Sequence, residues 1–338
     1  MGIIRSRDIR STLLVVVAAC LLAACTGEVI DPAGSQGEQN SAGVLSTSET
    51  SSGTDPDIST DPAVGTDPSD SGSDPNDPST LPKITTRSAG CDLSAPSKRG
   101  TSTEQMLIAG ANRTYSLSVP ASYDHSRAYP LFFGFHGSSG GQATFVMDAG
   151  YEEDAIFIHP EALQVGSSRE WLGSSEAANM TFFDTLVADA AKTFCINLER
   201  VFVSGFSLGG EMASYVGCKR GDIVRGMAPI AGTWDYDNSC VGQVASYIGV
   251  GENDGLMNQW STLMAQEVID FYQCSGTQGW IPNESTCVRY TDCNPSDMPV
   301  AFCELPGVGH TTTDGNGNSL WGESIWRFSK SMCLRLLQ

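Results

Sequence analysis

The sequence predicts an α/β fold with a mostly parallel central sheet and helices on both of its faces. Short apolar runs such as PLFFGFHG and AIFIHP are typical of strands that are buried on both faces. Helical patterns alternate with these runs, and strands that alternate with helices form parallel sheets. A third observation is the stretch VFVSGFSLGGEMASY (201–215), in which an apolar run, a glycine-flanked serine and a helical pattern follow one another directly.

The expected elements follow in chain order from these patterns. EQMLIAGANRTYSLSVP predicts two strands around the Gly110–Asn112 turn, the second of which ends at Pro120. Apolar residues at helical spacing predict a helix at 180–194. The other expected elements are strands at 130–137, 155–160, 200–204, 226–230, 246–251 and 300–305, and helices at about 208–218, at about 259–272 and from about 319. Such a sheet places its functional residues at the carboxyl ends of its strands.

The amino-terminal part of the chain differs in composition from the rest. Residues 1–24 combine early arginines with an apolar run that is too short to span a bilayer, which suits a secretory signal. The run ends in LLAAC, which resembles the bacterial lipoprotein signal, so Cys25 is the expected lipidation site. The alternative is an ordinary signal peptide in which Cys25 has no role. Residues 25–89 are rich in Ser, Thr, Asp and Pro and predict a disordered linker, and residues 90–338 form one folded domain.

The cysteines agree with export to the cell envelope or beyond it. Nine of the eleven remain once Cys20 leaves with the signal and Cys25 is acylated. None of these nine has the spacing of a zinc site, so disulfides are expected in an oxidising compartment, and no metal or cofactor is expected. An odd number leaves at least one thiol unpaired within the chain. The spacing fixes neither the pairing nor the oligomeric state.

The charge balance limits the partners that the protein can have. The formal net charge is −20, which disfavours nucleic acid and anionic membrane surfaces. The membrane contact that we expect is therefore the lipid at Cys25, for which several acyl chains give stable anchoring.

Ser207 is the candidate nucleophile. It lies in GFSLG, a match to G-x-S-x-G, and this motif needs small neighbours because its serine sits in a strained turn between strand and helix. A buried structural serine between two glycines is the alternative interpretation. The strand, turn and helix context favours the nucleophile.

A base and an acid follow Ser207 in the chain order that such a site requires. His310 is the only histidine after the serine, and it follows the last expected strand. Glu252 and Asp254 both follow an apolar strand, and Asp254 is the better candidate because it lies further into the turn. It would hold the tautomer of His310 and stabilise the imidazolium. A role for Asp254 in forming the turn is the alternative.

Two backbone N–H groups are the expected oxyanion donors. FHGSSGG (135–141) follows a central strand and offers the N–H of Ser138, and Leu208 offers its N–H directly after the nucleophile. Taken alone, a glycine-rich segment of this kind can also be a simple turn.

Three stretches together resemble secreted feruloyl esterases and polyhydroxybutyrate-depolymerase-like esterases. They are GANRTYSLSVPASYDHSRAYPLFFGFHGSSGG, FVSGFSLGGEMASYVGCKRGDIVRGMAPIAG and GVGHTTTDGN with the later IWRFS. The likeness covers 91–336. It implies an α/β-hydrolase fold with Ser207, Asp254 and His310 as the triad, and it implies that Trp171 in REWLGSS lines the acyl pocket. Trp171 as a core or surface aromatic is the alternative.

The sequence departs from this family at two points. Where members read H-G-x-x-D before the acid, this chain has VGEND, so the histidine is missing. Where members carry an aromatic residue and a proline after the base, this chain has Thr311 and Thr312. At the first point the aspartate itself still aligns with the family's acid. The second difference concerns the rim of the site, so it weakens the choice of substrate more than the type of reaction.

The expected function is that of a serine carboxylic-ester hydrolase that works through an acyl-enzyme. The resemblance implies that it releases ferulate or related aromatic acids from plant cell-wall xylan. The alternatives are a depolymerase of polyhydroxybutyrate or another aliphatic polyester, an acetylxylan esterase, and a catalytically inactive surface-binding lipoprotein. The complete triad argues against the last of these, whereas serine geometry alone does not exclude amide cleavage.

Overall fold

A computed structural model describes residues 87–93, 98–138, 140–141, 150–234, 239–281, 284–296 and 298–332. The expected signal peptide and the lipidation site at Cys25 lie outside these residues. Nearly all of the expected linker lies outside them too, but Arg87 already pairs with Asn197 in an isolated bridge. Within the part of the chain that the structure describes, no helix is long and apolar enough to cross a membrane.

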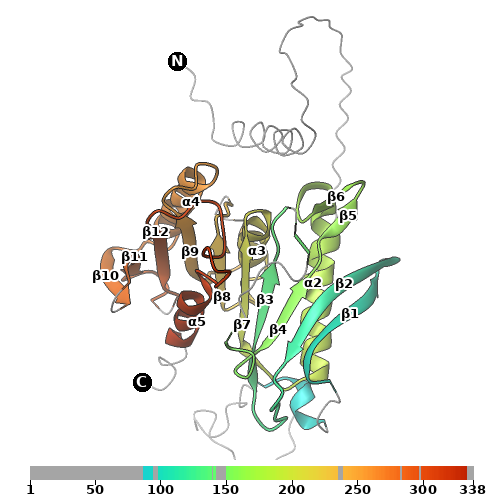
Figure 1. Cartoon of the computed structure of the whole chain (residues 1–338). Helices are drawn as coiled ribbons and strands as arrows, with labels where there is room; N and C mark the ends of the chain where they lie inside the picture. Colours follow the sequence, from blue (N-terminus) through green and yellow to red (C-terminus); the bar gives the residue numbers. More distant parts are fainter. Residues whose placement is uncertain are drawn as a thin grey trace, which may run out of the picture. The chain divides into compact units, whose positions relative to one another are not determined.

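A ten-stranded sheet forms the centre of this part of the chain (Figure 1). Its six middle strands are parallel: β4 (Ile156–Pro160), β3 (Tyr129–Phe135), β7 (Ile196–Phe206), β8 (Gly226–Ile230), β9 (Ala245–Gly251) and β12 (Val300–Leu305). Antiparallel hairpins continue the sheet on either side: β1 (Gly100–Ile108) with β2 (Ala111–Val119) beside β4, and β11 (Glu284–Thr291) with β10 (Gly276–Ile281) beside β12.

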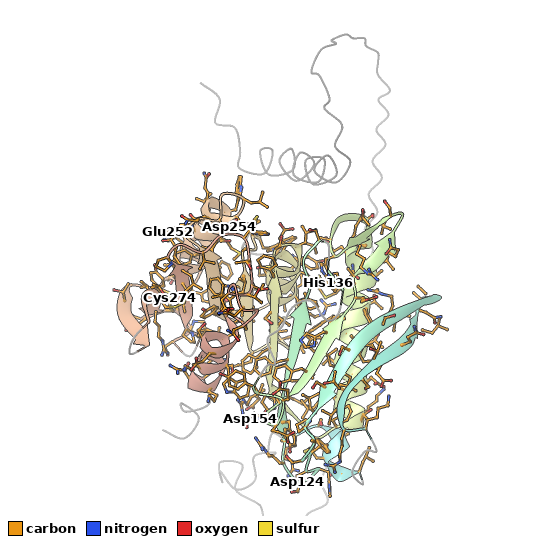
Figure 2. The ribbon with its side chains drawn as sticks, in the orientation of Figure 1. Asp124, His136, Asp154, Glu252, Asp254 and Cys274 are labelled. Atoms are coloured by element: carbon orange, nitrogen blue, oxygen red, sulfur yellow. A yellow bond between two sulfur atoms is a disulfide. The ribbon has the colours of Figure 1, made fainter. Side chains whose placement is uncertain are left out.

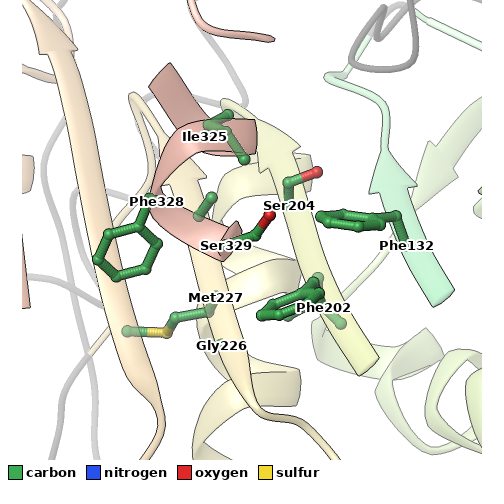
Figure 3. Close-up of a pocket in the computed structure, with 10 residues that line it drawn as sticks. Phe132, Phe202, Ser204, Gly226, Met227, Ile325, Phe328 and Ser329 are labelled. Carbon is green, nitrogen blue, oxygen red and sulfur yellow. The ribbon is translucent and has the colours of Figure 1, made fainter. Parts of the chain in front are cut away.

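Helices cover both faces of the sheet, as the sequence predicts. They are α2 (Glu176–Thr193), α3 (Leu208–Lys219) and α4 (Asn258–Phe271) on one face, and α5 (Gly322–Ser331) on the other. Successive residues of a strand point to opposite faces, so Phe133 of β3 contacts Phe183 of α2 while Phe132 contacts Trp326 of α5. The small apolar cavity between α5 and the strands has a volume of about 10 Å³ (Figure 3), which is too small for a ligand.

The predicted strands and helices are present, with shifts of a few residues at their ends. The sequence did not predict β10 and β11, or the small hairpin of β5 (Leu163–Val165) and β6 (Ser168–Glu170). Two single-turn helices, η1 (Ala89–Asp92) and η2 (Gly173–Ser175), were also missed. The segment of β10 and β11 lacks clear apolar alternation, and a disulfide joins β11 to its neighbour β12.

Disulfides are present, as expected from the cysteine content. The four pairs are Cys91–Cys195, Cys218–Cys240, Cys274–Cys293 and Cys287–Cys303. Cys287 and Cys303 are direct partners in the register of β11 and β12. The ninth cysteine, Cys333, lies outside the described residues. Four disulfides fit an extracellular protein.

Candidate active site

The candidate catalytic residues follow parallel strands and meet at one edge of the sheet. Ser207 follows β7, Asp254 follows β9 and His310 follows β12, while the expected oxyanion donor Ser138 lies in the segment after β3. These strands run in the same direction, so their carboxyl ends lie at the same edge. Figure 2 shows Asp254 and His136 in the upper half of the coloured ribbon and Asp124 at its lower end.

Ser207 occupies a strained turn between β7 and α3. Its φ is +56° and its ψ is −122°, a conformation that costs energy for a residue with a side chain. A Cβ atom on Gly205 would lie 2.1 Å from the carbonyl oxygen of Gly209, and one on Gly209 would lie 2.0 Å from that of Phe135. Both glycines of the motif are therefore required by close backbone packing.

Two backbone hydrogen bonds hold this turn in place. The N–H of Ser207 donates to the carbonyl of Ile230 at the end of β8 (2.9 Å), and the carbonyl of Ser207 accepts from the N–H of Glu211 in α3 (3.0 Å). The strained backbone is thus tied both to the neighbouring strand and to the helix that follows.

His310 and Asp254 form a hydrogen-bonded pair next to this turn. Nδ1 of His310 lies 2.7 Å from Oδ2 of Asp254, whose side chain is fully buried, and the imidazole ring lies 4.5 Å from the ring of Phe206, the residue before the nucleophile. The second oxygen of Asp254 accepts from the N–H groups of Leu256 (3.1 Å) and Met257 (2.9 Å). Because Nδ1 faces the carboxylate, Nε2 is the nitrogen that is left for the serine hydroxyl.

The pKa of Asp254 is lower than that of an ordinary aspartate. Burial alone would raise it, but the hydrogen bond with His310 and the N–H groups of Met257 and Leu256 outweigh the burial. The carboxylate is therefore ionised at neutral pH and can stabilise a positively charged imidazole.

Glu252, the other acid that the sequence left open, has a different partner. Its Oε2 accepts from the backbone N–H of Gly307, 2.9 Å away, in the turn that follows β12. The structure thus pairs His310 with Asp254, while Glu252 binds the backbone of the segment that leads to His310.

The loops of the acid and the base are packed directly on each other. The N–H of Asn253 donates to the carbonyl of Val308 (2.8 Å), and a Cβ on Gly251 would lie 2.2 Å from that same oxygen. Beyond His310, the indole N–H of Trp321 donates to the carbonyl of Thr311 (3.3 Å). These contacts fix the distance between the two catalytic loops.

The segment that carries the expected oxyanion donors lies against the nucleophile. A Cβ on Gly137 would lie 3.6 Å from Cβ of Ser207 and 3.4 Å from the carbonyl oxygen of Phe206. Ser138 follows Gly137, and Leu208 is the first residue of α3. Leu208 is thus the direct chain neighbour of Ser207, and Ser138 directly follows a residue that packs against Ser207.

Trp171 lies behind this segment, in the core. It is 3 % exposed, its indole N–H donates to the carbonyl of His136 (2.8 Å), and its ring contacts those of Phe135 and His136. The side chain of His136 has a further partner, because its Nε2 accepts from the N–H of Ala162 (3.1 Å). The contacts of Trp171 thus position the oxyanion segment, and its expected role in lining the acyl pocket stays a prediction.

A buried polar network supports Trp171, and the sequence analysis missed it. The side-chain amide of Asn179 donates to the carbonyl of Trp171 (2.8 Å), and Nη2 of Arg113 donates to Oδ1 of Asn179 (2.6 Å). Both polar residues are buried. Neither stands in a recognisable motif, because only the fold brings β2, α2 and the segment before α2 together.

Glu211 is a buried carboxyl group close to the nucleophile. It lies four residues after Ser207, in the first turn of α3, and is 9 % exposed. Burial raises its pKa from 4.5 to about 8, so the group is mostly protonated at neutral pH. No sequence pattern indicates this state, which depends on the packing around α3.

The fold and this arrangement define the class of the protein. A mostly parallel sheet, a serine in a strained strand-to-helix turn, and a histidine–aspartate pair after later strands are the features of an α/β-hydrolase. An acetyl xylan esterase from Aspergillus awamori has a similar fold, with a TM-score of 0.52 and 15 % identity over 68 % of this chain and 99 % of that one. The predicted fold is confirmed.

Similarity in sequence leads to a narrower group. The chain is 26 % identical to a probable feruloyl esterase C of Aspergillus clavatus over 72 % of its own length and 90 % of that protein. It is 28 % identical to feruloyl esterase D of Neurospora crassa over 70 % of its own length and 78 % of that protein. No family model matches the chain. The predicted resemblance to feruloyl esterases is confirmed, and the protein is a carboxylic-ester hydrolase.

Substitutions at the triad separate the two acids. We expect Ser207→Ala to reduce turnover by about 10⁴-fold or more and Asp254→Asn by up to about 10⁴-fold, because the first removes the nucleophile and the second stabilises the wrong imidazole tautomer. Glu252→Gln is the matched control and should cost far less. Steady-state kinetics on a soluble ester provide the measurement. A larger loss in Glu252→Gln than in Asp254→Asn would contradict the assignment of Asp254 as the triad acid.

A substitution at Trp171 separates positioning from acyl binding. Trp171→Phe keeps an aromatic ring but removes the donor to His136, so we expect kcat to fall about tenfold with little change in KM as the oxyanion segment loosens. Trp326→Phe is the control, because Trp326 is equally buried but lies on the other face of the sheet. A raised KM with unchanged kcat would instead support the acyl-pocket role of Trp171.

The raised pKa of Glu211 predicts a pH dependence of stability. Between its ordinary pKa of 4.5 and about 8, the folded protein holds a proton that the unfolded chain releases, so the free energy of unfolding falls as the pH rises through this window. Relative to wild type, Glu211→Gln should gain stability by about 1 kcal/mol per pH unit between pH 5 and 7.5. Urea unfolding across this range provides the measurement, with the exposed Glu199→Gln as control. Parallel pH profiles for wild type and Glu211→Gln would contradict the prediction.

Proposed function

We propose that the protein is a serine feruloyl esterase that releases aromatic acids from ester-decorated plant cell-wall polysaccharide through an acyl-enzyme. The observation that carries the proposal is the hydrogen-bonded pair of His310 and Asp254 beside the strained turn of Ser207. The relatives named feruloyl esterase support ferulate as the acyl group of the substrate, since their similarity extends over most of this chain.

The reaction follows from the roles that the geometry supports. Oγ of Ser207 attacks the ester carbonyl while Nε2 of His310 takes its proton, and Asp254 stabilises the imidazolium. The N–H groups of Ser138 and Leu208 stabilise the negative oxygen of the tetrahedral intermediate. His310 then gives its proton to the sugar oxygen as the bond between this oxygen and the carbonyl carbon breaks. The sugar leaves with a free hydroxyl, and the acyl group stays on Oγ of Ser207. A water molecule, activated by the same histidine, releases the acid.

Aromatic side chains near the triad support an aromatic acyl group. Phe206 and Trp260 are partly buried and pack against a small cluster of Ala231, Val250 and Met257. This cluster adjoins the acid, because Met257 donates its N–H to the carboxylate of the triad. Partly exposed rings at a site provide apolar area with defined geometry for a planar ligand.

The amino-terminal part of the chain belongs to the same proposal. We infer export through the signal at 1–24, lipidation at Cys25 and a linker at 25–89 that carries the hydrolase. The four disulfides support an oxidising destination. A lipid-anchored enzyme on a long linker suits a substrate that is itself an insoluble polymer.

A panel of ester substrates tests which acyl group the enzyme prefers. We expect a higher kcat/KM for methyl ferulate than for p-nitrophenyl butyrate once the better nitrophenolate leaving group is taken into account, and release of ferulic acid from arabinoxylan. Both activities should be absent from Ser207→Ala. Clearing of a polyhydroxybutyrate film without ferulate release would favour the aliphatic polyester alternative, and release of acetate alone from xylan would favour an acetylxylan esterase.

A further inference from the structure

A hollow lined by both polar and apolar residues lies at the same edge of the sheet as the candidate triad. It has a volume of about 220 Å³ and is lined by 111–114, 161–164 and Arg169. β2 runs antiparallel to β4, with Tyr115 opposite Pro160, so the start of β2 lies beside the carboxyl end of β4. The strand order β2, β4, β3, β7 places this hollow three strand spacings, or about 14 Å, from the strand that leads to the nucleophile.

One wall of the hollow is shared with the oxyanion segment. A Cβ on Gly141, at the end of that segment, would lie 3.1 Å from Oε1 of Glu161. The N–H of the next residue, Ala162, donates to Nε2 of His136. The hollow and the candidate catalytic centre are therefore neighbouring parts of one surface, close enough to contact a single extended substrate.

The side chains around the hollow are suited to hydroxyl groups. Glu161 provides acceptor oxygens, Arg169 provides donors and lies 3.0 Å from it, and Asn112 and Gln164 provide amide groups that both donate and accept. Ala111, Ala162 and Leu163 also line the hollow, so it offers apolar contacts beside these polar groups. Sugars carry several hydroxyls that each donate and accept, so they match the mixture.

Arg113 forms a fixed positive part of the wall. It is 3 % exposed, it donates to the carbonyl of Glu161 (2.9 Å) and to Oδ1 of Asn179 (2.6 Å), and its guanidinium lies 4.2 Å from the centre of the ring of Phe182. None of the hydrogen bonds described for it goes to a carboxylate. The charged residues that line the hollow are Arg113, Arg169 and Glu161. The lining therefore carries no net negative charge, whereas the formal net charge of the chain is −20.

We propose that this hollow is a sugar subsite that binds one ring of the polysaccharide while the ester on that polysaccharide lies at Ser207. The proposal rests on the function proposed above and adds the part of the surface that recognises the carbohydrate. A volume of about 220 Å³ holds several water molecules, which a single sugar ring would displace while replacing their hydrogen bonds.

Kinetics on two ferulate esters test the subsite. The quantity is the ratio of kcat/KM for a feruloylated arabinoxylo-oligosaccharide to kcat/KM for methyl ferulate, which lacks the sugar. We expect Arg169→Met to lower this ratio about tenfold through the KM of the oligosaccharide, because charge-assisted hydrogen bonds are lost. Asn112→Ala should lower the ratio too, because Asn112 also lines the hollow.

Arg127→Met is the matched control for this experiment. Arg127 is 53 % exposed and pairs with Asp154 at 3.6 Å, away from the hollow, so its substitution should leave the ratio as in wild type. An unchanged ratio in both Arg169→Met and Asn112→Ala would overturn the subsite while leaving the feruloyl esterase proposal intact.

Binding of a sugar that carries no ester tests the subsite separately from the proposed esterase function. We expect calorimetry to detect binding of an unesterified arabinoxylo-oligosaccharide to wild type and to Arg127→Met, and to show its loss in Arg169→Met. If wild type cleaved neither ferulate ester, the proposed function would be wrong, and this titration would still decide the subsite. The subsite proposal would be overturned if the oligosaccharide did not bind to wild type, or if it bound to Arg169→Met as tightly as to wild type.

Discussion

The close approach of α3 to the end of β3 is the constraint on which the site depends. Gly209, in the first turn of the helix, leaves no room for a Cβ against the carbonyl of Phe135, and Gly205 leaves none against Gly209 itself. With larger residues the helix would have to move away from the sheet. The contact brings the first N–H groups of α3 and the glycine-rich segment after β3 to the same serine, where an oxyanion would form.

Residues on other elements hold the segments around Ser207 in place. Trp171 holds the oxyanion segment from the core through the carbonyl of His136, and Ile230 holds the serine backbone from the neighbouring strand. Asp254 is rigid because three hydrogen bonds fix both of its oxygens. A protonated Glu211 adds no negative charge near a centre where negative charge would develop. The groups of the candidate site are therefore held in place by contacts within the protein itself.

Sequence patterns were sufficient for the local features. The apolar runs predicted the parallel strands, the glycines around Ser207 predicted the strained turn, and the order of residues predicted that His310 and Asp254 would be partners. Features that depend on distant packing could not be predicted in this way. The burial that keeps Glu211 protonated, the polar network of Arg113 and Asn179, and the edge strands β10 and β11 have no periodic signal, because their partners lie on other elements.

The disulfide between Cys91 and Cys195 determines where the rest of the chain is joined to the hydrolase. It lies at the amino end of β7, beside the bridge of Arg87 and Asn197, while the nucleophile follows the other end of the same strand. Eleven residues of β7 separate these two ends by about 33 Å. A mechanical load on the preceding residues is therefore carried by a covalent cross-link at the base of the sheet. The cross-link therefore lies at the edge of the sheet opposite to the edge that holds the candidate triad.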